Sequence, residues 1–316
     1  MENTNAPTPT PHAANPAVVA VVVTYNRLEL LRRNLDCLRA QTHPLAGIVV
    51  VNNGSTDGTE QWLDSQTDLT VITQDNCGGA GGFARGLIVA LHLPAAWLWC
   101  MDDDVFPRPT CLEELLREST RQKADILAPR RLVDGRVYSN DFVSYDLSRP
   151  FASLYVGKHV GTRTDVPVEI AGTAFEGPLI RREVVERIGL PNRDLFIFCD
   201  DTDYCLRATR AGFRIFYVPA ALMDKHQFFS TDNWSQRQQK KKWKRYYQIR
   251  NSTYLNHHYG RNWAVRHLRG FNAVAGYMVI AAVTAPFSKA WRLTDIGRLW
   301  RAYRDGLAER LGIIHD

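Results

Sequence analysis

The chain has 316 residues, of which 45% are hydrophobic and 10% aromatic, so it suits one large α/β domain or a domain with an appended segment. Its six cysteines are scattered without a CxxC pair, which we interpret as reduced thiols of a cytosolic protein. Residues 1–16 have neither a basic start nor an apolar run. They are therefore no signal peptide, and we expect them to lack a fixed structure.

The net charge of +6 is unevenly distributed along the chain. Residues 228–316 carry 16 Lys and Arg against 5 Asp and Glu, whereas residues 1–227 carry 23 against 28. An acidic body with a basic tail indicates an anionic partner, either a membrane surface or a nucleic acid.

The first hundred residues alternate between strand and helix patterns. Apolar runs at 17–24, 47–51, 69–73 and 95–100 predict buried strands. The helical patterns between them start near Leu28, Thr59 and Phe83. This order predicts a parallel, doubly wound sheet, in which ligands bind beyond the carboxyl ends of the strands.

Polar side chains follow each of these four predicted strands. They are Tyr25-Asn26 after the first strand, Asn52-Asn53 after the second, Asn76 after the third and Asp102 to Asp104 after the fourth. Because the carboxyl ends of parallel strands meet at one edge of a sheet, four polar clusters should converge there. Their convergence indicates a ligand site more strongly than any one cluster does.

The acidic triplet Asp102-Asp103-Asp104 follows the buried run at 95–100. Adjacent carboxylates repel one another and are costly at the end of a buried strand unless a cation or donor cluster compensates them. Mg²⁺ or Mn²⁺ holding a phosphorylated ligand would do so. The alternative from the residues alone is a solvated turn that caps the next helix.

A glycine-rich segment, residues 76–82, lies between the third strand and its helix. It is neither a Walker loop, because no GK[ST] follows, nor a GxGxxG fingerprint at the first strand. It is either a flexible connection or a backbone that passes close to a ligand and donates amide hydrogen bonds. Arg85 in the following helix could reach a diphosphate.

The middle of the chain is less regular. Residues 130–167 give no clear assignment, and strands are expected on either side of a loop at 172–177. A second acidic cluster, Asp200-Asp201, precedes a predicted helix at 204–210, which either carboxylate could cap. A strand at 213–218 leads toward His226, for which a structural role and a metal-ligand role remain open.

The tail divides into three patterns. Residues 240–247 are basic with interleaved aromatic residues, and the apolar run 271–287 is marginal for a membrane span at 17 residues. A helical apolar stripe, backed by arginines, follows at Ile296, Leu299, Trp300, Tyr303, Leu307 and Leu311. The stripe is typical of an interfacial helix on anionic lipid, and its alternative is a helix packed on the main domain.

Several of these segments together resemble the family-two glycosyltransferases, which have the GT-A fold. The matching pieces are VVVTYNR, VVVNNGSTDGT, the DDD triplet, FIFCDDTDYCLRATRAGFRI and His226, over residues 17–226. The segment NxGGAGGFxRG and the FIFCDD sequence look most like galactofuranosyltransferases, and YYQIRNSTYL in the tail looks like bacterial members that act on lipid-linked glycans. Rhamnosyltransferases share much of the same pattern.

The resemblance implies a role for each matched position. Thr24, Tyr25 and Asn52 would line the uracil and ribose pocket, although the family usually has Asp where Asn52 stands. Asn76 and Arg85 would approach the donor, and Asp103 would contact its ribose or sugar. Asp102, Asp104 and His226 would bind Mn²⁺ or Mg²⁺, and Asp201 would act as the general base. Phe175, Glu176 and Asp200 would contact the acceptor.

The resemblance also implies a domain plan: a catalytic domain over 17–227 and a basic, helical, membrane-associating segment over 228–316. The expected reaction is inverting, metal-dependent transfer of galactofuranose from UDP-galactofuranose to a lipid-linked surface polysaccharide. The enzyme is expected at the cytoplasmic face of the membrane, bound peripherally, with oligomers possible. The alternatives are a rhamnosyltransferase that uses dTDP-rhamnose and, from another class, a nucleic-acid-binding protein that uses the basic aromatic tail.

Overall fold

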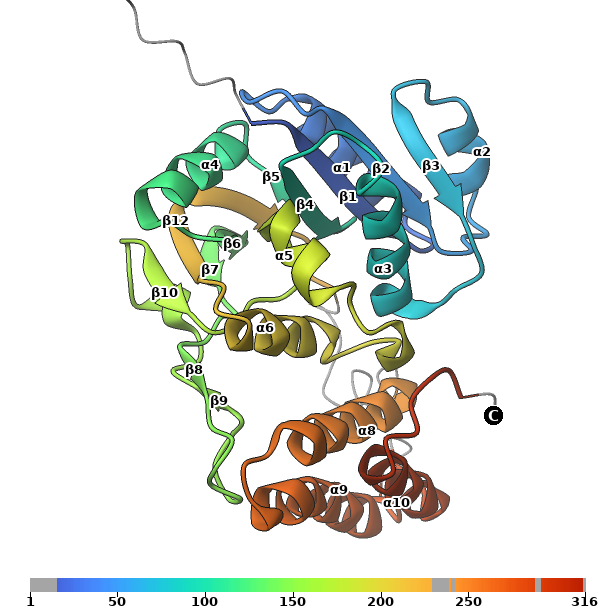
Figure 1. The fold of residues 1–316 in the computed structure, drawn as a ribbon. Helices are drawn as coiled ribbons and strands as arrows, with labels where there is room; N and C mark the ends of the chain where they lie inside the picture. Colours follow the sequence, from blue (N-terminus) through green and yellow to red (C-terminus); the bar gives the residue numbers. More distant parts are fainter. Residues whose placement is uncertain (1–15, 229–238, 240–241, 288–290, 315–316) are drawn as a thin grey trace, which may run out of the picture.

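The computed structural model describes residues 16–228, 239, 242–287 and 291–314. A mixed sheet of ten strands forms its centre, and a bundle of helices from the C-terminal part lies at one end (Figure 1). The main path of the sheet has the strand order β10-β12-β6-β11-β4-β1-β2-β3. All but Pro16 of the N-terminal stretch expected to lack structure lies outside the described residues.

The N-terminal part of the sheet, residues 18–102, follows the predicted alternation. Its elements are β1 (Val18–Thr24), α1 (Leu28–Arg39), β2 (Gly47–Asn52), α2 (Thr59–Asp64), β3 (Leu69–Thr73), α3 (Gly78–Ala90) and β4 (Trp97–Asp102). β1 pairs in parallel with both β2 and β4, and β2 pairs in parallel with β3. The carboxyl ends of these strands therefore share one edge, as predicted.

Both faces of this sheet are covered by helices. Val19, Val21 and Val23 of β1 are buried in the core under α3, whereas Val18 and Val22 are buried in the core under α1. Successive side chains of a strand point to opposite faces, so a strand buried on both faces is a continuous apolar run. The doubly wound, mostly parallel α/β fold is thereby confirmed.

The glycine-rich segment is not a loop. Gly78 to Gly82 form the first turns of α3, which the sequence had placed only after them. A Cβ atom at Gly82 would lie 2.5 Å from Val23, and one at Gly86 would lie 2.4 Å from Val21. Real Cβ contacts are not this short, so glycine allows α3 to lie directly against β1. Close helix–strand packing explains the glycine content here.

The second half of the domain is more irregular than the sequence indicated. Its elements are β5 (Val105–Pro107), α4 (Cys111–Gln122), β6 (Ile126–Val133), β7 (Arg136–Tyr138), β8 (Ser144–Tyr145), β9 (Tyr155–Val156), η1 (Val160–Thr162), β10 (Val168–Ile170), β11 (Leu179–Arg181), α5 (Arg182–Ile188), η2 (Arg193–Leu195), α6 (Asp200–Arg210) and β12 (Ile215–Lys225). β11 enters the sheet antiparallel between β4 and β6. β8 and β9 pair as a separate hairpin.

Two boundaries differ from the predictions in ways that matter for the site. α6 begins at Asp200 rather than Tyr204, so both acidic residues of the second cluster lie in its first turn. β12 does not end at Val218 but continues through Pro219 to Lys225, with a register shift between Val218 and Leu222. The irregularity tolerates the proline, and the longer strand brings Lys225 beside the acidic triplet.

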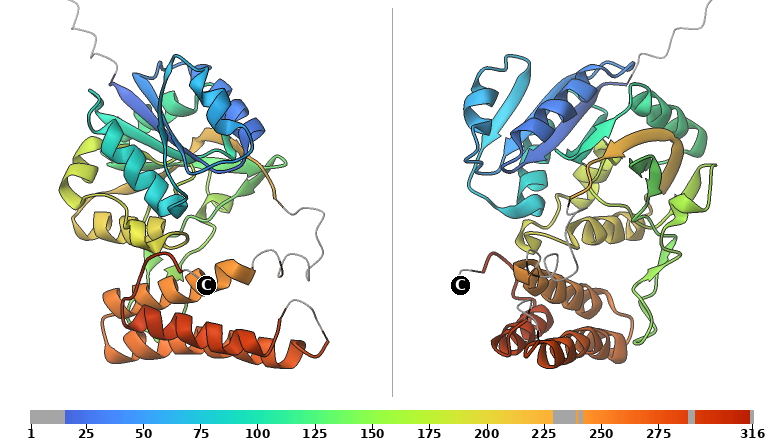
Figure 2. Two further views of the ribbon diagram at one scale, coloured as in Figure 1. Left: turned by 90° about the vertical axis from the view of Figure 1, so that its right-hand side faces the viewer. Right: turned by 180° about the vertical axis from the view of Figure 1, so that it is seen from behind.

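The C-terminal helices form a bundle of their own at one end of the molecule (Figure 2). They are α8 (Lys242–Tyr259), the π-helical η3 (Val265–Arg269), α9 (Gly270–Thr284) and α10 (Thr294–Leu307). Leu299 and Tyr303 of the predicted interfacial stripe are buried in this bundle, and Ile296 and Leu307 pack against its core. Most of the stripe therefore faces protein rather than the surface.

Among the helices that the structure describes, none is both long and apolar enough to cross a membrane. Lys240, Lys241 and Lys289 of the basic tail lie outside the described residues.

Candidate active site

The acidic triplet lies where β4 ends, beside the end of β1. Thr24 donates a hydrogen bond from Oγ1 to Asp103 Oδ2 at 2.7 Å, and Arg27 pairs with Asp103 Oδ1 at 2.9 Å. Arg27 also lies 3.8 Å from Asp104 and stacks over the ring of Phe228. Asp103, which is 1% exposed, is thus occupied by protein partners. It holds the ends of β1 and β4 together.

Lys225 supplies a second cation to the triplet. Its Nζ lies 3.1 Å from both oxygens of Asp104 and 3.1 Å from Glu176 Oε1. Burial opposes its charge, but Glu176 and Asp104 outweigh this effect and raise the pKa of Lys225. Glu176 in turn pairs with Arg131 at 3.1 Å, and Arg131 pairs with the fully buried Asp141. A continuous network of ion pairs therefore runs from the triplet through Glu176 to Asp141.

The charges around the triplet do not balance. Its three carboxylates and Glu176 face two cations, Arg27 and Lys225, because Arg131 is matched by Asp141. Asp102 accepts no hydrogen bond and forms no ion pair with any described residue, and burial together with Asp104 raises its pKa well above the usual range. Carboxylates that outnumber their cations offer oxygen ligands to a divalent cation such as Mn²⁺ or Mg²⁺, whose charge would favour the ionised form of Asp102.

His226 lies close to the triplet through its backbone. Its amide donates to the Asp104 carbonyl at 2.9 Å, while its exposed ring packs edge-on against Phe228. Within the described residues, no group of three or more His, Cys, Asp or Glu side chains is arranged as a metal site. In the structure, therefore, His226 adjoins Asp104, and the carboxylates are held by Arg27 and Lys225.

The residues expected to contact the nucleotide fall into two groups. Tyr25, Asn76 and Arg85 are exposed near the strand ends and on α3, so their side chains are accessible to a ligand. Asn52 is fully buried, and its side chain accepts from the Ser55 amide at 3.1 Å. The structure thus gives Asn52 a role in shaping its own turn.

The neighbouring Asn53 connects β2 to the glycine segment. Its Nδ2 donates to the Gly78 carbonyl at 2.9 Å, and its Oδ1 accepts from Gln74 at 2.9 Å and from the Cys77 amide at 3.2 Å. Asn76 Oδ1 accepts a hydrogen bond from the Gly78 amide at 2.9 Å. Asn53, which is 2% exposed, fixes the start of α3 against the strand end through its buried side-chain amide.

The second acidic cluster has a different environment. Asp201 Oδ1 accepts from the amide of Thr202 at 2.6 Å and from its hydroxyl at 3.1 Å, whereas Oδ2 accepts no hydrogen bond from the described residues. Burial raises the pKa of Asp201 to about 6, and burial together with Asp201 raises the pKa of Asp200 to about 8. No described cation forms an ion pair with either carboxylate. Asp203, by contrast, pairs with Arg207 and accepts from Tyr259.

Asp201 lines a large cavity to which both the α/β part of the chain and the C-terminal bundle contribute. The cavity has a volume of about 700 Å³ and is lined by side chains from three sources. They are Asn140, Phe142, Tyr155, Lys158 and His159 around the β8–β9 hairpin, Thr173, Ala174, Phe198, Cys199 and Thr202 beside Asp201, and Gln248, Ile249, Ser252, Ala273 and Tyr277 of α8 and α9. Aromatic faces combined with hydroxyl and amide groups suit a carbohydrate.

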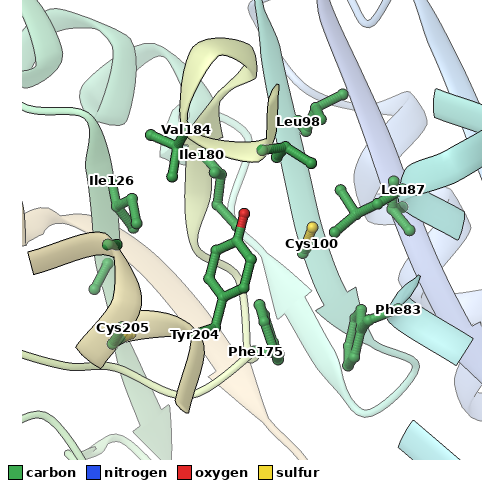
Figure 3. Packing of buried hydrophobic residues seen from close by; sticks show 14 of the residues in the cluster. Phe83, Leu87, Leu98, Cys100, Ile126, Phe175, Ile180, Val184, Tyr204 and Cys205 are labelled. Carbon is green, nitrogen blue, oxygen red and sulfur yellow. The ribbon is translucent and has the colours of Figure 1, made fainter. Parts of the chain in front are cut away.

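The structure separates the three residues expected to contact the acceptor. Phe175 packs in the core, with its ring centroid 4.8 Å from Phe83 and 5.6 Å from Tyr204 (Figure 3). Glu176 is committed to Lys225 and Arg131. Neither residue, nor Asp200, is among the described residues that line the cavity. Asp201 alone brings the second acidic cluster into it.

Sequence reasoning missed four charged residues of this region: Arg27, Lys225, Arg131 and Asp141. Arg27 belongs to the VVVTYNR segment, and Lys225 directly precedes His226, so adjacency to predicted site residues was an available signal. Arg131 and Asp141 carried no such signal, because they fall in or beside the irregular stretch at 130–167. The part of the cavity wall that α8 and α9 supply was also missed. No sequence pattern indicates that these helices line the same cavity as Asp201.

This arrangement is that of a GT-A glycosyltransferase, and comparison with known proteins confirms the class. A family model described as Glycosyl transferase family 2 matches residues 19–189. The chain therefore belongs to glycosyl transferase family 2.

Two curated relatives and one solved structure illustrate its neighbours. Galactofuranosyltransferase GlfT1 of Mycobacterium tuberculosis (strain ATCC 25618 / H37Rv) is 31% identical over 212 residues, covering 62% of this chain and 66% of that protein. The dTDP-rhamnosyl transferase RfbF of Shigella flexneri is 26% identical over 216 residues, covering 65% and 67%. Mannosyltransferase PcManGT from Pyrobaculum calidifontis, solved with GDP-Man and Mn²⁺, superposes with a TM-score of 0.52 at 18% identity, covering 94% of this chain and 89% of that one.

Proposed function

We propose that this protein is an inverting, metal-dependent glycosyltransferase that moves galactofuranose from UDP-galactofuranose to a lipid-linked glycan. The observation that carries the proposal is the pairing of two sites: a carboxylate cluster short of positive charge at the end of β4, and a buried base, Asp201, in a 700 Å³ cavity. The similarity to GlfT1 supports the choice of sugar.

The donor is assigned to the strand-end edge. Tyr25, Asn76 and Arg85 are exposed there and would contact the nucleotide-sugar. Asp102 and Asp104, with His226 beside them, would hold Mn²⁺ or Mg²⁺, which when bound would neutralise the charge that grows on the departing diphosphate. Asp103 fixes the two strand ends rather than facing the ligand freely. Arg27 and Lys225 add positive charge to the same place.

The proton transfer is assigned to Asp201. Its free oxygen Oδ2 would take the proton of the acceptor hydroxyl while the hydroxyl oxygen attacks the anomeric carbon. The bond from that carbon to the diphosphate breaks on the opposite face, so the configuration inverts. One carboxylate suffices for this displacement. Asp201 also suits the task because a pKa of about 6 leaves it mostly ionised at neutral pH and still a stronger base than an ordinary aspartate.

The acceptor is assigned to the cavity that Asp201 lines. Tyr155 and Phe142 of the hairpin region line it together with Tyr277 of α9 and Gln248 of α8, so sugar rings can stack while their hydroxyls hydrogen-bond. Because α8 and α9 form part of the wall, the C-terminal bundle is part of the proposed active site as well as a basic appendage.

The outer side of the bundle supports peripheral attachment to an anionic membrane, and we place the contact on α9. Val279, Val283 and Phe287 are 62%, 63% and 90% exposed, respectively. The same bundle carries exposed arginines on α10, including Arg301 and Arg304. A helical bundle with an exposed apolar face and exposed arginines is suited to lipid headgroups. This surface would hold the cavity near a lipid-linked acceptor at the cytoplasmic face.

Replacing Val279 and Val283 by Asp tests this attachment. Loss of two apolar anchors should reduce sedimentation with vesicles that contain anionic lipid by about tenfold or more. The matched control is Asp at Val143 and Val166, which are 47% and 66% exposed on the catalytic domain. Equal sedimentation of the two double variants would contradict α9 as the membrane face. Equal binding of the unaltered protein to neutral and to anionic vesicles would contradict the attraction to anionic lipid.

A rhamnosyltransferase is the second candidate, because RfbF matches over a similar share of the chain. The nucleic-acid alternative loses its structural basis. Tyr246 and Tyr247 are 3% and 4% exposed in the bundle core and offer no stacking platform, which leaves Trp243 as the exposed ring of the described part of that segment.

A donor panel tests the function. UDP-galactofuranose, dTDP-rhamnose, UDP-galactopyranose and UDP-glucose would each be supplied with Mn²⁺, and hydrolysis or transfer measured. We expect turnover of UDP-galactofuranose to exceed that of the other donors. Preference for dTDP-rhamnose would instead establish the second candidate, and no turnover of any donor would overturn the proposal.

A further inference from the structure

The segment that delivers Asp201 into the cavity is strained. Phe196, Phe198 and Cys199 have φ angles of +65°, +68° and +67°. This left-handed region is unfavourable for residues with a side chain and is rare for bulky ones. Three such residues within four positions directly precede Asp200 and Asp201. Strain of this kind persists only where surrounding groups impose it, and it concentrates at functional sites.

Helix α8 imposes the conformation from one side. Asn251 Nδ2 lies 2.8 Å from the Leu195 carbonyl and 2.9 Å from each of the Ile197 and Phe198 carbonyls. Arg250 Nε donates to Asn251 Oδ1 at 2.8 Å, so the amide group is held with its donors toward the loop. Asn251 is fully buried, which makes its three carbonyl contacts costly to leave unpaired.

Arg250 extends the same attachment. Its Nη2 donates to the Asp194 and Leu195 carbonyls at 3.1 and 3.2 Å, and its guanidinium stacks on Tyr247. Tyr247 in turn packs on the ring of Phe196, with centroids 4.8 Å apart. Arg250 and Asn251 direct their hydrogen bonds with the segment 194–198 to carbonyl groups. Backbone conformation, not side-chain chemistry, is therefore what this pair controls.

Helix α3 supports the loop from the other side. The Ala80 amide donates to the Phe196 carbonyl at 3.2 Å. A Cβ atom at Gly78 would lie 2.0 Å from that same carbonyl oxygen, so any side chain there would displace the loop. Gly78 is itself held by Asn53 and Asn76 at the donor edge. The loop before the base is thus clamped between the donor side of the sheet and the C-terminal bundle.

We propose that Arg250 and Asn251 of α8 act as positioning residues for the general base, holding the strained segment 195–199 so that Asp201 projects into the acceptor cavity. This inference rests on the proposed function, because it takes Asp201 as the base. In this role α8 contributes to the reaction by positioning the base, in addition to carrying basic charge and lining the cavity.

The test replaces Asn251 by Ala and compares it with Asn256→Ala. Asn256 is also buried on α8, but its side chain bonds to Ser252 and Arg269 and does not touch the loop. We expect Asn251→Ala to lower kcat about 10- to 100-fold, to leave the Kd for UDP within about threefold, and to speed amide hydrogen exchange at 195–201. Asn256→Ala should change the melting temperature without these effects.

A double-mutant cycle separates positioning from general destabilisation. If Asn251 acts through Asp201, adding Asn251→Ala to Asp201→Asn should cost almost no further activity. Full additivity, or an unchanged exchange rate at 195–201 in Asn251→Ala, would overturn the inference. If Asn251→Ala does not fold, Gly78→Ala displaces the same loop from the opposite side and should give the same exchange and kcat pattern. An unaltered Gly78→Ala enzyme would then count against the clamp.

The cycle also separates the two proposals. Substantial transfer by Asp201→Asn alone would refute the proposed base. Hydrogen exchange in Asn251→Ala would still decide whether α8 holds the loop.

Discussion

The two acidic clusters of this protein look alike in sequence and differ in the structure. Asp103 and Asp104 are held by Arg27 and Lys225, and Asp102 lies beside them without an ion pair to any described residue, so that burial and Asp104 raise its pKa. Asp200 and Asp201 have no cationic partner among the described residues, and burial raises the pKa of both. The first environment therefore suits the proposed metal site, and the second suits the proposed base. Compensation by neighbours, rather than the carboxylates themselves, distinguishes the two clusters.

Asp201→Asn should have the largest effect. An amide cannot accept the acceptor proton, so we expect the transfer rate to fall about 1,000-fold while the Kd for UDP stays near the wild-type value. Asp200→Asn is the matched control, because Asp200 lies one position away and outside the cavity lining. A larger loss in Asp200→Asn than in Asp201→Asn would exchange the roles of the two residues.

The raised pKa of Asp201 also sets the direction of the pH profile. Below a pKa of about 6 the carboxyl group is protonated and cannot act as a base, so kcat should fall about tenfold per pH unit on the acid side and level off above pH 7. Measurement of kcat at saturating donor, from pH 4.5 to 8, checks this limb. A flat profile would show that proton transfer to a group of this pKa does not limit the rate.

Asp104→Ala addresses the first cluster. Removing this carboxylate should lower transfer about 100-fold and abolish the stimulation by added Mn²⁺, because the leaving diphosphate loses its cation. Thermal unfolding of the variant serves as the control, since Asp104 also pairs with Lys225. A Mn²⁺ activation curve identical to that of the wild type would show that the triplet does not bind the metal.

Lys225→Met tests the same cluster by removing a positive charge instead of a carboxylate. The ammonium group lies against Asp104 and repels a divalent cation, so its removal should tighten Mn²⁺ binding by about tenfold. Electron paramagnetic resonance of free Mn²⁺ measures this without turnover. Arg108→Met is the control, because Arg108 forms its ion pair with Asp224, which directly precedes Lys225 on β12. Weaker binding in Lys225→Met would mean that Lys225 organises the site instead of competing for it.

Asp200→Asn has the smallest expected effect on transfer, and its expected consequence concerns stability. The folded protein keeps the Asp200 proton up to about pH 8, whereas the unfolded chain releases it near its ordinary pKa of about 4. The folded state therefore binds more protons between these values, and stability falls as pH rises through the window. Asp200→Asn should remove this loss and gain on the order of a few kcal/mol at pH 8 relative to pH 5 in urea unfolding. Parallel pH dependence in both proteins would argue for a solvated Asp200.

The two clusters also differ in how far they can be predicted. The positions of the triplet, its strand and the three other strand ends were predicted correctly, because buried parallel strands are continuous apolar runs whose carboxyl ends share an edge. Asp201 was assigned as the base by resemblance, which stays a prediction, and its helix was started four residues late. Its three left-handed predecessors have no signal in their residue types, since Phe and Cys do not favour that conformation.

What the sequence by itself determined is the local part of the protein: continuous apolar runs for β1 to β4, helical patterns between them, and carboxylates and amides at the strand ends. Only the tertiary structure decided which cations compensate the triplet, that α8 and α9 close the cavity around Asp201, and that the apolar stripe of α10 faces its own bundle. The physical reason is that hydrophobic periodicity is a property of neighbouring residues. Charge pairing and cavity walls join segments about a hundred residues apart, whose contact depends on how the whole chain packs.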